Sequence, residues 1–193
     1  ISKPNDCTYQ SIEQLRTTHV HQCFFNDEET LTFLEKKIKE KACSNRNYTN
    51  VKASSTDWQE FINDEHFAKV VNFLVKNFST NNLTAFKSPL SNDYKITVFD
   101  AWGIQYKKGD KTIRHDHSQS DFSTCLYFSE GQELCTCHGN YKPHRGLMLT
   151  LSGWDEHWVE EIKEDCDRCV LVFNWIRYRG WEAKEQKWKE RKK

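Results

Sequence analysis

The sequence contains few residues that break secondary structure and carries no excess charge of either sign. Only three of its 193 residues are proline and seven are glycine, which argues against a disordered or linker-rich chain. Lysine plus arginine and aspartate plus glutamate both number 28, so net charge gives no indication of nucleic-acid binding. No apolar run approaches the roughly 18 residues that span a bilayer, and no signal peptide is visible. We therefore expect no membrane partner and a cytoplasmic location.

The N-terminal half shows the apolar spacing of two helices. The first is predicted over 26–43, with Asn26 as N-cap and Glu29 at the capping-box position. The second is predicted over 56–79, with a break near Asn63. Each has apolar residues on one face, as expected for helices that cover a sheet. These residues are Leu31, Leu34 and Ile38 in the first helix, and Phe67, Val70, Val71, Leu74 and Phe78 in the second.

The C-terminal half changes to the pattern of short strands. The stretch YKITVFDAWGIQY (94–106) is rich in β-branched and aromatic residues, and KKGDK (107–111) is typical of a turn. Further strands are predicted at 112–117, 122–129, 133–138, 146–151, 157–162 and 168–178. Strands at this spacing, with no helices between them, favour an antiparallel sandwich or jelly roll. The fold class is therefore mainly β with N-terminal helices.

We expect one domain over 1–193, because a chain of this length can bury a core without help. Residues 1–90 would be a helical support region and 91–180 the β core. Residues 181–193 form a charged tail, which we interpret as a solvated helix or a frayed end. The oligomeric state is left open.

Two histidines at the end of a predicted strand are candidate metal ligands. His115 and His117 project to one face of a strand, while Asp116 projects to the other. Such a pair is weak evidence alone, because H-x-H occurs by chance in many proteins. A third histidine, His157, begins a later strand that can lie beside the one carrying His115 in a jelly roll.

A buried arginine is predicted on the last strand. Arg168 opens RCVLVFNWI, the most apolar strand in the chain, where alternation should point it into the interior. A buried guanidinium needs an anionic partner, and no carboxylate is evident on that face. A bound carboxylate would satisfy it. Tyr127, four residues after Ser123 on a strand that can also face inward, could help to hold the same group.

The order of these features resembles that of 2-oxoglutarate/iron(II)-dependent dioxygenases, and looks closest to their small prolyl-hydroxylase-like members. The ordered set is H-x-[D/H], then [S/T]-x-x-x-Y, a Gly-led strand, a distal His, and an Arg about ten residues further on. It covers roughly residues 95–178 of this chain.

The resemblance implies a double-stranded β-helix that binds iron(II), 2-oxoglutarate and dioxygen and hydroxylates a prime substrate that the sequence does not identify. By position, His115, His117 and His157 would bind the metal. Arg168 would pair with the C5 carboxylate of 2-oxoglutarate, with Tyr127 and Ser123 in support.

The chain departs from the family pattern at the third ligand. The family motif is H-x-D, but the residue two after His115 is His117. Imidazole suits iron(II), yet a site of three histidines carries one negative charge fewer than the usual triad. Asp121 is an alternative ligand if the loop at 118–121 folds back.

Other interpretations remain open on sequence grounds. A cupin, a metal-binding jelly roll without 2-oxoglutarate, would use His115, His117, Asp121 and His157, but it has no need of a buried arginine. A structural zinc site would make the protein an interaction module, and paired disulfides are a further alternative. The zinc ligands would come from Cys135, Cys137, His138, Cys166 and Cys169. The remaining alternative is a β-sandwich with incidental histidines.

Overall fold

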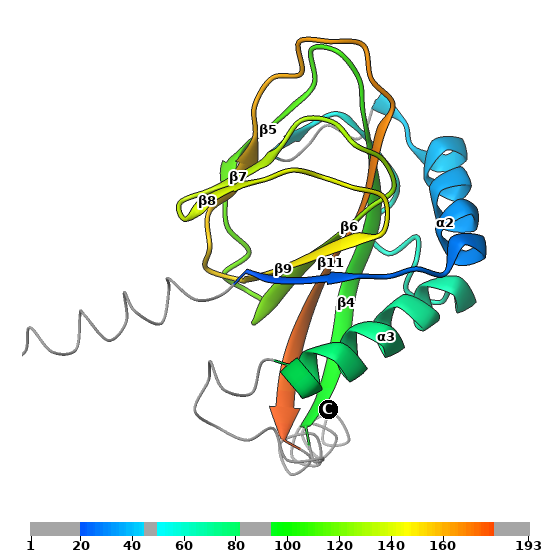
Figure 1. Cartoon of the computed structure of the whole chain (residues 1–193), viewed down its shortest axis with the longest axis vertical. Coiled ribbons are helices and arrows are strands. Elements are labelled where there is room, and N and C mark those ends of the chain that lie inside the picture. The colour runs from blue at the N-terminus through cyan, green and yellow to red at the C-terminus, as the bar shows by residue number, and fades with distance from the viewer. Residues whose placement is uncertain (1–19, 45–49, 82–93, 180–193) are drawn as a thin grey trace, which may run out of the picture.

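The computed structural model describes residues 20–44, 50–81 and 94–179, and within these ranges the strands form two antiparallel sheets (Figure 1). The larger sheet has the order β1 (His21–Phe24), β9 (Leu147–Ser152), β6 (Phe122–Tyr127), β11 (Arg168–Arg179), β4 (Tyr94–Tyr106), β3 (Ser54–Ser55). The smaller sheet has the order β2 (Val51–Lys52), β5 (Lys111–His115), β10 (His157–Val159), β7 (Leu134–Thr136), β8 (Gly139–Tyr141). The predicted class, mainly β with N-terminal helices, is confirmed.

Two apolar cores lie on opposite faces of the larger sheet. Along β11, Leu171 and Phe173 belong to the core under the helices, whereas Val170 and Val172 belong to the core between the sheets. This split follows from strand geometry, because successive side chains project to opposite faces. The inner core also contains Leu134, from the smaller sheet, so the two sheets pack face to face.

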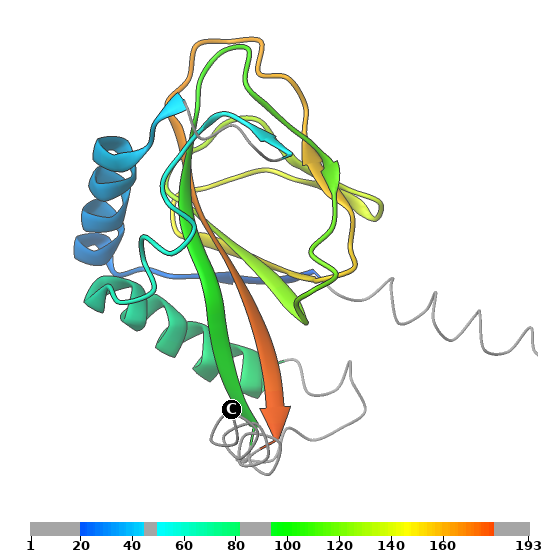
Figure 2. The same ribbon diagram turned by 180° about the vertical axis from the view of Figure 1, so that it is seen from behind.

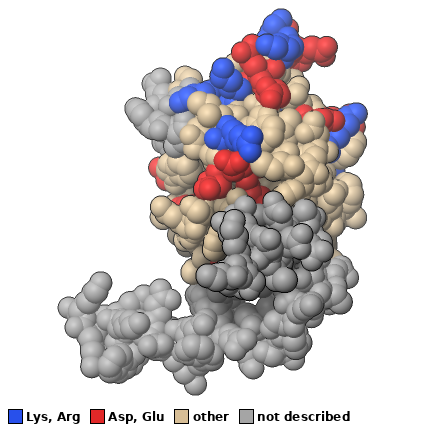
Figure 3. All heavy atoms as spheres, turned by 90° about the vertical axis from the view of Figure 1, so that its left-hand side faces the viewer, with Lys and Arg blue, Asp and Glu red and all other residues tan. Residues whose placement is uncertain are grey.

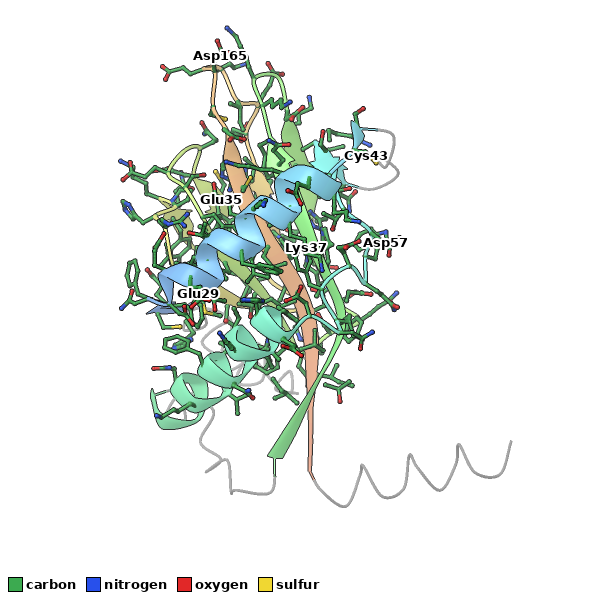
Figure 4. The ribbon with its side chains drawn as sticks, turned by 90° about the vertical axis from the view of Figure 1, so that its right-hand side faces the viewer. Glu29, Glu35, Lys37, Cys43, Asp57 and Asp165 are labelled. Atoms are coloured by element: carbon green, nitrogen blue, oxygen red, sulfur yellow. The ribbon has the colours of Figure 1, made fainter. Side chains whose placement is uncertain are left out.

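Both helices cover the outer face of the larger sheet, as Figures 1 and 2 show from opposite sides. They are α2 (Glu28–Lys41) and α3 (Glu65–Asn81). In Figure 4, α2 lies across β4 and β11. The approach is close at Gly103 of β4, where an added Cβ would lie 2.3 Å from Cγ1 of Ile38. Only glycine lets this helix pack so near the strand.

The predicted start of the first helix is wrong by one residue. The N-cap is Asp27, not Asn26, and its carboxylate accepts hydrogen bonds from the Thr30 backbone N–H (3.0 Å) and hydroxyl (2.8 Å). Thr30 rather than Glu29 therefore occupies the position three residues after the cap. Both oxygens of one carboxylate are engaged at once, which stabilises the later start.

The second helix begins at Glu65, nine residues later than predicted, so the region near Asn63 precedes the helix and does not interrupt it. Before it, the backbone bonds to β4 instead of forming a helix: Ala101 N–H donates to Trp58 O (2.8 Å), and Phe61 N–H donates to Ala101 O (3.3 Å). Asp64 then caps α3, accepting a bond at 2.9 Å from the His66 N–H. The strands β1, β2 and β3 were not predicted, so the N-terminal region adds to both sheets. The tail at 181–193 lies outside the described residues.

In the described part of the chain no helix is both long and apolar enough to cross a membrane. In the described part of the face that Figure 3 shows, acidic and basic side chains intermingle. That part of the face therefore has no extended region of one charge.

Candidate metal centre and buried anion pocket

Three histidine rings converge at one point between the sheets. The ring centroids of His115 and His157 are 4.6 Å apart, those of His115 and His117 are 5.0 Å apart, and those of His117 and His157 are 5.1 Å apart. One ring nitrogen from each lies within 4.8 Å of the others. The three residues that the sequence proposed as ligands are thus brought together.

Strand pairing and a close turn position these rings. His157 of β10 pairs directly with His115 of β5, so their side chains lie side by side. His117 follows β5 in a turn whose backbone is held by Gly153: His117 N–H donates to Gly153 O (2.7 Å), and Gly153 N–H donates to Asp121 O (2.8 Å). A Cβ at Gly153 would lie 1.9 Å from Ser120 O, so the turn that carries His117 requires glycine there.

Backbone carbonyls fix the tautomers of two of the rings. His115 Nδ1 lies 2.7 Å from Ile113 O, and His157 Nδ1 lies 3.0 Å from Asp155 O. Because a carbonyl can only accept, each Nδ1 carries the hydrogen and each Nε2 keeps its lone pair. Metal-binding histidines are usually oriented in this way by the nitrogen that does not bind the ion.

All three histidine rings of the cluster are neutral at neutral pH. Burial, together with the neighbouring His157 and His115 rings, lowers the pKa of His117 to about 3. Burial and the His115 ring lower the pKa of His157 to about 4. The pKa of His115 is also lowered, mainly by burial. Protonation therefore does not compete with a metal ion for these nitrogens near pH 7.

Among the described residues, no carboxylate joins the three histidines. Asp116 is exposed, and its Oδ1 accepts a bond from the Ser118 N–H (3.2 Å). The backbone carbonyl of Asp121 accepts from Gly153 in the turn, and Asp121 is not part of the convergent group.

The structural-zinc interpretation gains no support. Among the described residues, the three histidines are the only group of His, Cys, Asp or Glu side chains close enough to hold a metal ion. Every cysteine in the described ranges is a free thiol. Cys169 belongs to the core under the helices, whereas Cys166 packs against the core between the sheets, so the two thiols of this pair lie in different cores.

A narrow pocket runs from the histidines to Arg168, whose side chain is 1% exposed. Its Nε and Nη1 have no hydrogen-bond partner among the described residues. The guanidinium carbon lies 4.5 Å from the ring centre of Tyr106 and 5.4 Å from that of Tyr127. Among the described residues the guanidinium has these cation–π contacts and no carboxylate partner. The sequence predicted the burial and the missing carboxylate but not the two rings.

The two tyrosines differ in what their hydroxyls contact. The Tyr106 hydroxyl shares a hydrogen bond of 2.6 Å with the Thr112 hydroxyl. The Tyr127 hydroxyl is fully buried and has no hydrogen-bond partner among the described residues. Burial raises the pKa of Tyr127 well above its ordinary value, so the phenol stays protonated and can donate. The Arg168 end of the pocket therefore holds several unused donors and no acceptor charge.

Ser123 is not brought to this pocket. Paired residues on neighbouring strands form layers across the inner face of the larger sheet. Arg168 shares one layer with Tyr106, and Asn174 shares another with Ser123. Six residues of β11 separate these two layers, which corresponds to about 20 Å along a strand. Ser123 Oγ is buried and unpartnered among the described residues, but it lies at the opposite end of the barrel from the guanidinium.

Sequence reasoning missed the contribution of β4 to the site. Trp102, Ile104 and Tyr106 line the pocket, and the Trp102 ring lies 6.2 Å from the His117 ring. The signal was present, since these residues alternate at period two along the strand. That alternation does not reveal which of the two buried faces encloses the pocket.

The two facing sheets with this strand order constitute a double-stranded β-helix, with His115 and His157 on the smaller sheet and Arg168 on the larger. No family model and no curated protein sequence matches the chain.

Solved structures of oxygenases share the fold. The viral collagen prolyl hydroxylase from Paramecium Bursaria Chlorella virus-1, solved with 2-oxoglutarate, aligns over 83% of this chain and 96% of its own, with a TM-score of 0.61 and 12% identity. A prolyl-4-hydroxylase from Pseudomonas putida aligns over 85% and 95%, with a TM-score of 0.59 and 16% identity. HygX from Streptomyces hygroscopicus, solved with nickel and 2-oxoglutarate, aligns over 86% and 85%, with a TM-score of 0.61 and 10% identity.

Proposed function

We propose that the protein is a non-haem iron(II) and 2-oxoglutarate-dependent oxygenase that hydroxylates a substrate. One observation carries the proposal: three neutral, convergent imidazoles and a buried, unpaired guanidinium line the same pocket. The fold shared with the oxygenase structures supports it.

His115, His117 and His157 would hold the metal. Imidazole is a good ligand for iron(II), and three ligands on one face leave open positions for a chelating keto acid and for dioxygen. The site differs from the usual two-histidine, one-carboxylate arrangement in having no anionic ligand. The ion would therefore keep its full positive charge, which favours an anionic cosubstrate.

Arg168 would bind the distal carboxylate of 2-oxoglutarate. Its Nε and Nη1 have no other partner among the described residues, and the Tyr127 hydroxyl beside it is a further unused donor. Charge-assisted bonds from a guanidinium to a carboxylate are strong and directional. The open space in the pocket is about 30 Å³.

Iron(II) and 2-oxoglutarate, when bound, supply C–H oxidation coupled to decarboxylation of the keto acid to succinate. The chain's own contribution is to hold the ligands and exclude water. Between the histidines and Arg168 the wall is apolar, formed in part by Ile104, Val170 and Val172. A dry wall strengthens the ion pair at Arg168, because charges interact more strongly at low dielectric.

The test is an anaerobic titration of the metal-free protein with iron(II) and 2-oxoglutarate. We expect a visible metal-to-ligand charge-transfer band only when both are present. His157→Ala should lose iron, whereas Arg168→Ala should keep iron and lose the keto acid. His144→Ala is a matched control, because this half-buried histidine lies outside the cluster.

Two outcomes would overturn the proposal. Unchanged iron binding in His157→Ala would show that the ligands are elsewhere. Equal keto-acid affinity in wild type and Arg168→Ala, or metal binding without any keto-acid effect, would favour a metal-binding jelly roll that does not use 2-oxoglutarate.

A further inference from the structure

A second, polar cleft of about 270 Å³ opens on the other side of the histidines from Arg168. It is lined by Phe99, Asp100, Asp116, His117, Ser118, Gln119, Ser120 and Asn174. His117 lines both this cleft and the pocket that leads to Arg168, so a group bound in the cleft lies next to the metal centre.

A β-bulge shapes one wall of the cleft. In the pairing of β11 with β4, Asn174 lies opposite Asp100 but Trp175 lies opposite Val98, so Phe99 is an extra residue. Without the bulge, neighbouring side chains would project to opposite faces of the sheet. Because of it, Phe99 and Asp100 both line the cleft. Bulges of this kind commonly redirect a side chain beside a functional site.

The cleft contains an unused hydrogen-bond acceptor. Asn174 is 6% exposed, and its Oδ1 has no hydrogen-bond partner among the described residues. Its amide N–H donates to the Asp100 carboxylate, which fixes the orientation of the amide group. Asn174 Oδ1 and the carboxylate oxygens of Asp100 are all acceptors. An amide group turned by 180° would therefore lose this hydrogen bond. Asn174 therefore presents its oxygen as an acceptor that requires an external donor.

The Asp100 carboxylate also has no cationic partner. Among the described residues that line the cleft there is no lysine or arginine, whereas Asp100 and Asp116 both line it. Asp100 is half-buried, and burial raises its pKa although the Asn174 amide opposes the shift. A carboxylate in this setting is stabilised by a positively charged donor.

We infer that the prime substrate carries a cationic nitrogen, a protonated amine or a guanidinium, that binds between Asp100 and Asn174. The cation would donate to the Asp100 carboxylate and to Asn174 Oδ1. Phe99 would contact the carbon chain that leads to the cation. This inference rests on the proposed oxygenase function only in naming the ligand a substrate, since the cleft itself needs no metal.

The arrangement also sets the direction of approach. On the inner face of β4 the Trp102 ring lies 6.2 Å from the His117 ring, with Asp100 one layer further toward the cleft and Tyr106 two layers away toward Arg168. The cationic group and the keto acid would therefore bind on opposite sides of the metal. The C–H bond to be oxidised would lie on the carbon chain of the substrate, a short distance from its cationic nitrogen.

The test measures binding of three matched probes to the full-length, metal-free protein. Benzylamine, benzyl alcohol and benzoate share one ring and differ in the charge of the head group. We expect benzylamine alone to bind saturably, with the weak affinity usual for so small a ligand. In ¹⁵N-correlated NMR spectra it should shift the side-chain amide signal of Asn174, which requires no variant.

Variants locate the probe. Asp100→Asn should weaken benzylamine binding at least tenfold, because it removes the charge and keeps the shape. Asp165→Asn is the matched control, since it makes the same change in a loop away from the cleft, at the tip of the molecule in Figure 4. It should leave the affinity unchanged.

Equal binding of benzyl alcohol and benzylamine, or an unshifted Asn174 signal, would overturn the inference. So would equal benzylamine affinity in Asp100→Asn and wild type. The two proposals fail separately: iron and keto-acid binding without benzylamine binding would refute the cationic substrate alone. Benzylamine binding that depends on Asp100, with no keto-acid binding, would refute the oxygenase and leave the cation cleft standing.

Discussion

Arg168→Met should stabilise the protein in the absence of cosubstrate and abolish its response to 2-oxoglutarate. Methionine keeps an unbranched apolar stem in the position of the arginine stem and removes the buried charge. In the wild type the guanidinium is 1% exposed and no ion pair to it is present among the described residues. The variant thus separates the cost of burying this charge from its use in binding.

The magnitude follows from the surroundings of the guanidinium. Burying an ion costs several kcal/mol, and replacing buried charged groups with apolar residues of similar volume often stabilises a protein by about 1–4 kcal/mol. The contacts with Tyr106 and Tyr127 recover part of the cost, up to about 2 kcal/mol for a desolvated pair. We therefore expect a gain near the lower end of that range, or about 2–4 °C in Tm for each kcal/mol.

Arg145→Met is the matched control, because this arginine is fully paired. Its guanidinium donates to Glu35 (2.6 Å), Glu28 (2.8 Å) and the carbonyl oxygen of Phe128 (2.8 Å). Glu35 is largely buried and would keep only its ion pair with Lys39 (2.9 Å), so the same substitution removes a short charged hydrogen bond and should destabilise the protein. Two identical substitutions should thus have effects of opposite sign.

The assay is thermal and urea unfolding with and without iron(II) and 2-oxoglutarate under nitrogen. At one hundred times its dissociation constant, the keto acid should stabilise the wild type by about 2.7 kcal/mol and Arg168→Met not at all. An Arg168→Met protein that is less stable than the wild type without ligand would refute the argument that the charge is unpaired. Stabilisation of this variant by 2-oxoglutarate would refute the assignment of the anion site.

Three further predictions concern the histidines and the turn beside them. Since the pKa values of His117 and His157 are lowered to about 3 and about 4, the unfolded chain binds their protons first as pH falls below about 6.5. These two groups should therefore not affect the free energy of unfolding of the metal-free protein above pH 6.5. Between pH 6.5 and 5 each histidine should lower it by about 2 kcal/mol, as measured by urea unfolding. A free energy of unfolding that does not change over this range would contradict the burial of neutral rings. Gly153→Ala should weaken iron binding by displacing the turn that carries His117, whereas Gly103→Ala, which clashes with α2, should lower Tm and leave iron affinity unchanged; equal iron affinity in both would contradict the positioning role of Gly153. His117→Asp should retain iron and His117→Leu should lose it in equilibrium dialysis, and retention by both would place the third ligand elsewhere.

The convergence of the histidines could be predicted in part from the sequence. Strand geometry places His115 and His117 on one face, and a jelly roll can bring a later strand to the first. The pairing of His157 with His115 depends on register across the smaller sheet, which has a shift between His157 and Val159. No local pattern specifies that shift, because it results from how long-range strands pack.

The residues at the two ends of the pocket differ in whether the sequence could identify them. Arg168 was found because a charged residue at the start of an apolar strand is unusual, and that signal is local. Ser123 was wrongly expected to accompany it, since a spacing within one strand does not show which layer of the barrel each residue reaches. Asp100 and Asn174 were missed because their pairing lies between β4 and β11, far apart in the sequence.

The absence of a carboxylate from the histidine cluster has a thermodynamic consequence. Neutral ligands leave a bound iron(II) ion with its whole charge, and the unpaired guanidinium of Arg168 adds another positive charge in the same low-dielectric pocket. Each cation disfavours the other until a doubly negative molecule lies between them. Binding of the ion and of the dianion should consequently be linked, and by reciprocity each should increase the affinity for the other by the same factor. A protein built in this way would hold its metal loosely when the keto acid is scarce and tightly when it is plentiful.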